Sequence, residues 1–190
     1  MSDTEKDKSG RTEPEKAPGT LTALLKDKPK RGRPPRAVSR KNVYVSMTDA
    51  QKGLLTALAD RLPDGLNRAD LPDLAITLLA ARLEAMRQAV ADRDREIPEG
   101  ITDLESLYLL WDLPLPDSDA DARWTSIRLS PQQGIELGRA HGTLNVVFGA
   151  NRSEIFGLGL ALLEQYLQNQ APEDATSLPE MQRHVRGIYL

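Results

Sequence analysis

The residues of this chain that are best suited to chemistry are basic, and they lie close together near the N-terminus. From Lys26 to Lys41 there are eight basic residues and one acid, although the chain of 190 residues has a formal net charge of −3. A local charge of +7 over sixteen residues is typical of a segment that binds a polyanion such as nucleic acid. A second block, from Asp92 to Ala122, contains ten acids and two arginines, and we expect it to face away from that polyanion.

No set of residues suits catalysis. The two histidines, His141 and His184, have no acidic partners at metal-ligand spacing, and there is no cysteine. The run "GLGLA" at 157–161 lies in an apolar helical pattern and indicates close helix packing, not a phosphate loop. We therefore expect no catalytic residue, no metal site and no cofactor. The charged N-terminus and the short apolar runs predict a cytoplasmic protein that is not associated with a membrane.

Two short stretches, 42–47 and 124–129, are expected to position further polar side chains. In "NVYVSM" and "WTSIRL" the side chains alternate in polarity, which predicts two half-buried strands. Successive side chains of a strand point to opposite faces, so one face would be buried and the other exposed. The expected buried set is Val43, Val45, Met47, Thr125, Ile127 and Leu129. The expected outward set is Asn42, Tyr44, Ser46, Trp124, Ser126 and Arg128.

Each predicted strand is followed by signals for two helices. The segments 48–51 and 130–133 are S/T-x-x-Q capping boxes that lie 82 positions apart, and the second also has a proline at the first helical position. Second helices are expected to begin at "NRAD" (67–70) and at "NRSE" (151–154). Pro72 leaves Asp70 open as an alternative start for the first of these two helices. The sequence therefore predicts the same order of elements, strand, helix and helix, two times.

The repeat predicts a mainly α fold in which two strand–helix–helix units of one chain pack face to face as a pseudo-dimer. An acidic connector with one short helix at 102–112 is expected between them, capped at Thr102, and it could join two chains or pack on its own unit. We expect the C-terminal tail to be loosely attached. The predicted parts are a disordered basic arm (1–41), the first unit (42–91), the acidic connector (92–122), the second unit (123–169) and the tail (170–190).

The two units resemble the ribbon-helix-helix DNA-binding family, the fold of Arc and MetJ. The resemblance implies two ribbon-helix-helix units whose strands pair as a short two-stranded antiparallel β-ribbon, and it implies that this ribbon enters the major groove of double-stranded DNA. Arg128 would then pair with guanine and Asn42 with adenine, and serine or tyrosine would bond to bases or phosphates. Trp124 could instead pack at the edge of the ribbon. Because the two outward sets differ, we expect a non-palindromic target site.

The resemblance also implies that the second helices hold phosphates at their N-termini, where backbone amides are unpaired and the helix dipole is positive. Plain helix capping is the alternative use of these residues. The residues that match this phosphate clamp are Asn67, Arg68, Asn151, Arg152 and Ser153.

The basic arm contains "KRGRPPR", which resembles an AT-hook with its Arg-Gly-Arg-Pro core. That resemblance implies binding in the narrow minor groove of AT-rich DNA. A basic tail that only screens phosphates is the alternative. The arm residues in question are Lys30, Arg31, Gly32, Arg33, Pro34, Arg36, Arg40 and Lys41.

Two such units in one chain resemble TraY-like and T-DNA-processing accessory proteins of DNA transfer. The resemblance implies a plasmid or mobile-element accessory factor, acting in conjugation or partition, or else a transcription regulator of the repressor type. Self-association or a partner protein at the connector helix is also open. The rival from another class is a helical protein-interaction module whose basic tail only keeps it soluble.

Overall fold

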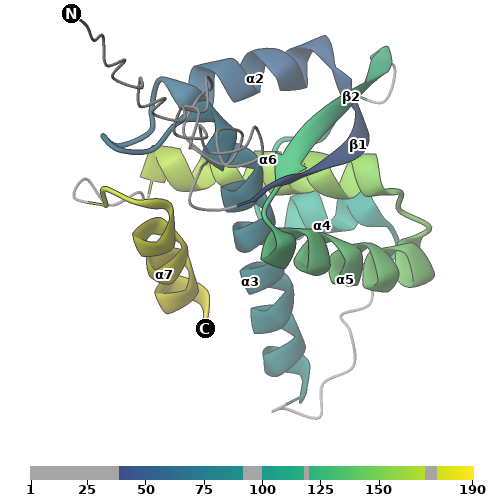
Figure 1. Cartoon of the computed structure of the whole chain (residues 1–190). Helices are drawn as coiled ribbons and strands as arrows, with labels where there is room; N and C mark the ends of the chain where they lie inside the picture. Colours follow the sequence, from purple (N-terminus) through teal and green to yellow (C-terminus); the bar gives the residue numbers. More distant parts are fainter. Residues whose placement is uncertain (1–38, 92–99, 118–119, 170–174) are drawn as a thin grey trace, which may run out of the picture. The chain divides into compact units, whose positions relative to one another are not determined.

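The structure, a computed structural model, describes residues 39–91, 100–117, 120–169 and 175–190. These residues are mainly helical and contain a two-stranded antiparallel sheet, which confirms the predicted fold class at this level (Figure 1). The predicted arm lies outside the described residues except for its last three positions. The elements are β1 (Lys41–Thr48), α2 (Asp49–Ala59), the 3₁₀ turn η1 (Arg68–Asp70), α3 (Leu71–Ala91), α4 (Leu104–Leu110), β2 (Ala122–Leu129), α5 (Pro131–Phe148), α6 (Arg152–Asn169) and α7 (Leu178–Tyr189).

The two strands pair along their whole length. Lys41 lies opposite Leu129 at one end of this ribbon, and Thr48 lies opposite Ala122 at the other. The face predicted to be buried packs on the helices: Val45, Met47, Ile127 and Leu129 are buried, and Val43 and Thr125 are half-buried. The alternating polarity of the sequence therefore identified the correct face of both strands.

The helices after the strands bury matching positions. Leu55 and Leu58 of α2 lie in the core, as do Leu137 and Ala140 of α5. Helix α2 ends at Ala59, earlier than its apolar spacing predicts. Both helices present a narrow apolar stripe to the core and leave their other faces in water.

Helices α3 and α6 form the centre of the core and approach each other closely. Residues 71–79 of α3 and 155–160 of α6 are all buried. At Gly159, a methyl group would lie 3.1 Å from the backbone oxygen of Ala75. The glycine therefore lets two backbones meet that a larger side chain would separate.

The first of these central helices begins through a 3₁₀ turn. Asn67 is the capping residue of η1, and its side chain accepts a hydrogen bond from the amide of Ala69 at 3.1 Å. The backbone amide of Asn67 donates to the Asp70 carboxylate at 2.9 Å. The α-helix itself begins at Leu71, directly after Asp70, as the alternative start predicts, whereas the reciprocal cap lies one turn earlier at Asn67. Pro72 fits because it lies in the first turn, where its missing amide hydrogen would have no helical partner.

The connector helix α4 is capped by Asp103, whose carboxylate accepts from the amide of Ser106 at 2.8 Å, so the predicted cap at Thr102 is wrong. The helix packs on the fold, with Leu107 and Trp111 buried. Gln165 of α6 donates to the backbone oxygen of Trp111 at 3.0 Å. Of the two alternatives for this helix, the structure therefore shows packing against its own chain.

The expectation of a loosely attached C-terminal tail is wrong. Residues 178–189 form α7, which packs along α3 (Figure 1). Met181 and Val185 are both 0% exposed. The prolines at 172 and 179 suggested an irregular tail, but Pro179 lies in the first turn of α7, where proline is compatible with a helix. Burial of one apolar stripe then holds the helix in place.

Candidate nucleic-acid interface

The outer face of the ribbon carries the six residues predicted to lie there. All are exposed except Ser46, which is half-exposed. Tyr44 is 66% and Trp124 75% exposed, values that are unusual for large apolar side chains. Trp124 does not pack into the fold at this edge. Across the two strands the outward residues face one another as Asn42 with Arg128, Tyr44 with Ser126 and Ser46 with Trp124.

The inner face and one helix end hold this surface in place. Valine, isoleucine, threonine and aromatic residues favour the extended backbone of both strands. The backbone amide of Ser46 donates to the hydroxyl oxygen of Ser153 at 2.8 Å. This bond attaches β1 to the N-terminus of α6. An outward side chain on a two-stranded ribbon so supported can enter a groove without unfolding its own scaffold.

The N-terminus of α6 forms its own cap. The side-chain oxygen of Asn151 accepts from the amides of Ser153 at 2.9 Å and of Glu154 at 3.1 Å. Glu154 accepts in return from the amide of Asn151 at 2.7 Å. Two of the amides that a phosphate would need are therefore already bonded, and the capping interpretation holds for Asn151. Arg152, which is exposed, remains available to an anion.

The corresponding turn at η1 has the same reciprocal cap. Asn67 and Asp70 bond to each other's backbone amides in the manner of Asn151 and Glu154. Arg68 is exposed beside this cap, as Arg152 is beside the other. The clamp residues thus divide into two capping asparagines, a serine whose hydroxyl is bonded to β1, and two exposed arginines.

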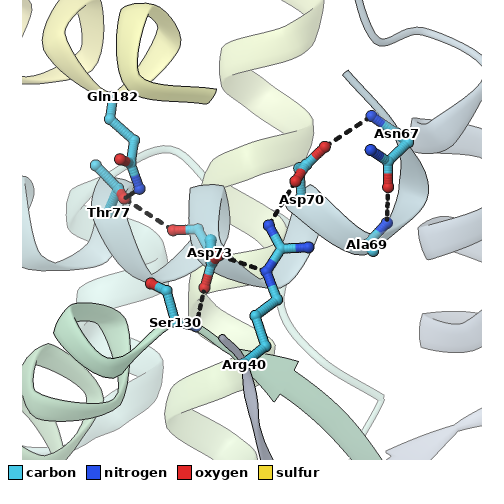
Figure 2. A network of polar contacts seen from close by, with 8 residues as sticks. All are labelled: Arg40, Asn67, Ala69, Asp70, Asp73, Thr77, Ser130 and Gln182. Carbon is cyan, nitrogen blue, oxygen red and sulfur yellow. Dashed lines mark hydrogen bonds and ion pairs between the residues drawn. The ribbon is translucent and has the colours of Figure 1, made fainter. Parts of the chain in front are cut away.

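Arg40 does not lie with the exposed cations. Its side chain is 6% exposed, and the guanidinium forms ion pairs with Asp70 and, at 3.0 Å, with Asp73 (Figure 2). Both of its carboxylate partners belong to the start of the central helix. We therefore leave Arg40 out of the proposed interface, although the sequence placed it in the arm. Lys41, the next residue, is exposed at the end of the ribbon.

Around Asp73 the ion pair extends into a network that joins four parts of the fold. Asp73 accepts from the backbone amide of Ser130 at 2.8 Å, at the junction of β2 and α5. Its backbone oxygen accepts from the Thr77 hydroxyl at 2.8 Å, and that hydroxyl accepts from Gln182 of α7 at 3.1 Å (Figure 2). Burial raises the pKa of Asp73, although the Ser130 amide and the Arg40 charge act in the opposite direction.

This network was missed by the sequence analysis. Asp70 and Asp73 lie three residues apart at the start of an otherwise apolar helix, and only Asp70 entered the prediction, as a possible helix start. A second signal was available, since buried acids need a cation and Arg40 is the basic residue next to the strand.

Other cations lie around the ribbon. Lys41, Arg123 and Arg128 are exposed on the two strands. The pKa of Asp49 lies below its ordinary value, mainly because of a hydrogen bond from Lys52 and also because of the charges of Lys52 and Arg123. Of the predicted arm residues, those from 30 to 36 lie outside the described part of the chain.

Away from the ribbon, a groove of about 950 Å³ lies between α3, α5 and α7. Its walls are mainly apolar and include Met86, Leu144 and Phe148, and no ribbon residue lines it. Within the described ranges, no three His, Cys, Asp or Glu side chains are grouped so that they could hold a metal ion.

A comparison with known proteins adds no relative. No family model matches the sequence, and neither a curated protein nor a solved structure is significantly similar to it. Over the described residues, no single helix has the length and hydropathy to cross a membrane. Helices α5 and α6 reach these values only as a pair, and they are bent by 110° at the break between them.

Proposed function

We propose that this chain binds double-stranded DNA in a sequence-specific manner, with the outer face of its ribbon in the major groove. The observation that carries the proposal is the set of three outward pairs, Asn42 with Arg128, Tyr44 with Ser126 and Ser46 with Trp124. A two-stranded ribbon fits the width of the major groove. Its outward asparagine and arginine have the donors and acceptors that adenine and guanine edges require.

We further propose that the two strand–helix–helix segments form a pseudo-dimer within one chain. Tyr44 and Ser126 are 82 positions apart, the spacing of the two helix caps, and they lie directly opposite each other in the ribbon. Ala75 and Gly159 are 84 positions apart, the spacing of "NRAD" and "NRSE", and they touch where α3 meets α6. A two-fold axis brings equivalent residues of two units into contact wherever it passes between them. Both contacts are therefore expected if such an axis passes through the centre of the ribbon and between α3 and α6.

The phosphates on either side of the groove would meet Arg68 and Arg152, because these arginines are exposed beside helix starts. The basic arm adds electrostatic affinity through its six cations between residues 26 and 36. The ion pairs of Arg40 fix the point from which that arm leaves the ribbon. Contacts to phosphate release counterions, so binding should weaken steeply with salt.

For the biological role, we propose an accessory factor of a plasmid or mobile element, acting in transfer or partition, or a transcriptional repressor. This proposal is supported by the resemblance of the sequence to tandem ribbon-helix-helix proteins. We also expect no catalytic residues from the sequence. Sequencing the genomic fragments that the chain retains would identify the locus and so separate these roles.

The test is a mobility-shift titration against random duplexes and against duplexes selected by the chain. Arg128→Ala should lower affinity for the selected site about tenfold or more and leave binding to random duplex nearly unchanged. Arg183→Ala removes an exposed arginine of α7 and is the matched control. Deleting residues 1–37 keeps the ion pairs of Arg40. It should weaken binding to both the selected and the random duplexes and should make the slope of log K against log salt less steep by about 5.

If the full chain binds neither class of duplex, the proposed function is wrong. The alternative of a helical protein-interaction module would then be preferred. If Arg128→Ala behaves like Arg183→Ala on the selected duplex, the chain binds DNA but does not read it through the ribbon.

A further inference from the structure

The two ends of the ribbon are chemically different. We name the end with Asn42 opposite Arg128 the Asn42 end, and the end with Ser46 opposite Trp124 the Trp124 end. Tyr44 and Ser126 lie between them, at the centre. In the repeat, Asn42 is equivalent to Trp124 and Ser46 is equivalent to Arg128, 82 positions apart in both cases. Identical units would therefore give identical ends, and both differences fall on outward, base-facing positions.

At the Asn42 end both outward side chains recognise bases by paired hydrogen bonds. Asparagine can bond to the N6 and N7 edge of adenine, and arginine to the O6 and N7 edge of guanine. At the Trp124 end the chemistry is mostly apolar. Trp124 exposes 75% of its surface, and the apolar group that a major groove offers is the methyl of thymine. Ser46 beside it is short and can donate or accept a single bond.

The supports behind the two ends differ as well. At the Trp124 end, the Ser46 amide bonds to Ser153 and attaches the strand to the N-terminus of α6. The equivalent of Ser153 in the first unit is Ala69, which has no hydroxyl group to repeat this bond. At the Asn42 end, the ion pairs of Arg40 hold the strand instead. The difference between the ends therefore extends below the surface.

We infer that the ribbon binds its duplex in one orientation, with the Asn42 end on adenine and guanine edges and the Trp124 end on thymine methyl groups. This inference rests on the proposed function. A symmetric dimer binds equally well after rotation by 180°, whereas here rotation would place Trp124 over the bases that Asn42 requires. The target is thus a directional site with two unlike halves.

The chain is well suited to a test of direction because it contains no cysteine, so a single introduced cysteine takes a single label. Ser39→Cys lies beside the Asn42 end and Ala122→Cys at the Trp124 end, and both positions are exposed. Each full-length variant is labelled with an iron–EDTA cleavage reagent and bound to duplexes selected from a random library by the unlabelled chain. The cleaved positions are then mapped on both strands.

Directional binding predicts that each label cuts one flank at least about tenfold more than the other, and that the two labels cut opposite flanks. Equal cutting of both flanks by each label would overturn the inference while leaving sequence-specific binding intact. If selection enriches no duplex, the proposed function fails, and the inference fails with it.

A symmetrised variant tests which residues set the direction. Trp124→Asn combined with Ser46→Arg gives both ends the same two residue types in equivalent places. The ratio of its affinity for a palindrome of the Asn42 half-site to its affinity for the original site should rise by about tenfold or more. Each label should then cut both flanks. Val146→Asn removes another exposed apolar side chain, 86% exposed on α5, and should leave the original preference unchanged. A folded symmetrised variant that retains the directional site would overturn the assignment to these residues.

Discussion

The two strand–helix–helix segments, residues 41–91 and 122–169, have the same order of elements but different bonds at the start of their first helices. In the first segment Thr48 forms a complete capping box with Gln51 of the same turn. The amide of Thr48 donates to the Gln51 side chain at 3.0 Å, and the amide of Gln51 donates to the Thr48 hydroxyl at 3.1 Å. In the second segment Ser130 occupies the capping position, but its side chain accepts no such bond.

The difference comes from the opposite segment. The amide of Ser130 is taken by Asp73 of α3, and Gln133, the counterpart of Gln51, is buried with no hydrogen-bond partner for its side-chain oxygen. At the position equivalent to Asp73, α6 has Gly157, where a methyl group would lie 2.8 Å from the side-chain nitrogen Nε2 of Gln51. Gly157 therefore leaves room for the capping box of Thr48 and Gln51. In the second segment, Asp73 accepts from the Ser130 amide, and no capping box forms there.

The comparison shows that two segments with the same order of elements can be held by different polar contacts. Among the described residues, buried ion pairs occur only at the first segment, and they involve Arg40, the residue before the ribbon. Among substitutions that alter these contacts, the largest loss of stability is therefore expected where a buried charge would lose its partner.

The largest effect is expected for Arg40→Leu. It leaves Asp70 and Asp73 buried without their cation, which should lower the free energy of unfolding by about 3–5 kcal/mol. Urea denaturation followed by circular dichroism measures the loss. Arg183→Leu, at an exposed position on α7, should change it by no more than about 0.5 kcal/mol. Equal effects of the two variants would show that the ion pairs do not stabilise the first half.

The next effect concerns the contact between the two halves. Gly159→Leu places a side chain against the backbone of Ala75, 3.1 Å from the first added carbon, and should cost about 1–3 kcal/mol or more through overpacking. Thermal unfolding measures the loss. Gly138→Leu on α5 is the control, because nothing lies within 4 Å of its added carbon. A Gly159 variant as stable as the control would contradict the close contact between α3 and α6.

A smaller effect separates the two caps directly. Thr48→Ala removes a hydroxyl that accepts from the Gln51 amide and should cost about 1 kcal/mol. Ser130→Ala removes a hydroxyl that makes no cap bond and should cost only a few tenths of that amount. The two variants are compared by denaturant midpoints at constant m-value. Equal losses would mean that the capping box does not distinguish the halves.

The smallest effect is a pH dependence that belongs to the first half alone. Because burial raises the folded-state pKa of Asp73 above its ordinary 3.8, its ionisation opposes folding. The stability of the wild type relative to Asp73→Asn should therefore be highest below pH 3.8 and fall as pH rises through the folded-state pKa. Unfolding measured at a series of pH values checks the sign. A relative stability that rises over this range would place the folded-state pKa below 3.8.

The sequence by itself determined the two strands, the helices that follow them and the buried face of each strand, but it did not predict α7. Alternation at 42–47 and 124–129 is a local pattern, and polar side chains on one face cannot be buried without partners, so this prediction depended on no distant residue. The caps at Thr48, Asn67 and Asn151 are equally local, because each acceptor lies within three residues of its donor.

The tertiary structure alone decided which of these local possibilities were used. Ser130 and Gln133 have the letters of a capping box, but a carboxylate 57 residues earlier in the chain takes the amide. Arg40 looks like part of a basic arm, but in the structure Asp70 of η1 and Asp73 of α3 form ion pairs with it. A buried charged side chain needs hydrogen-bond donors, so it can take a donor that a local partner would otherwise use. Which side chains are buried depends on the packing of the whole fold, and a short stretch of sequence does not contain that information.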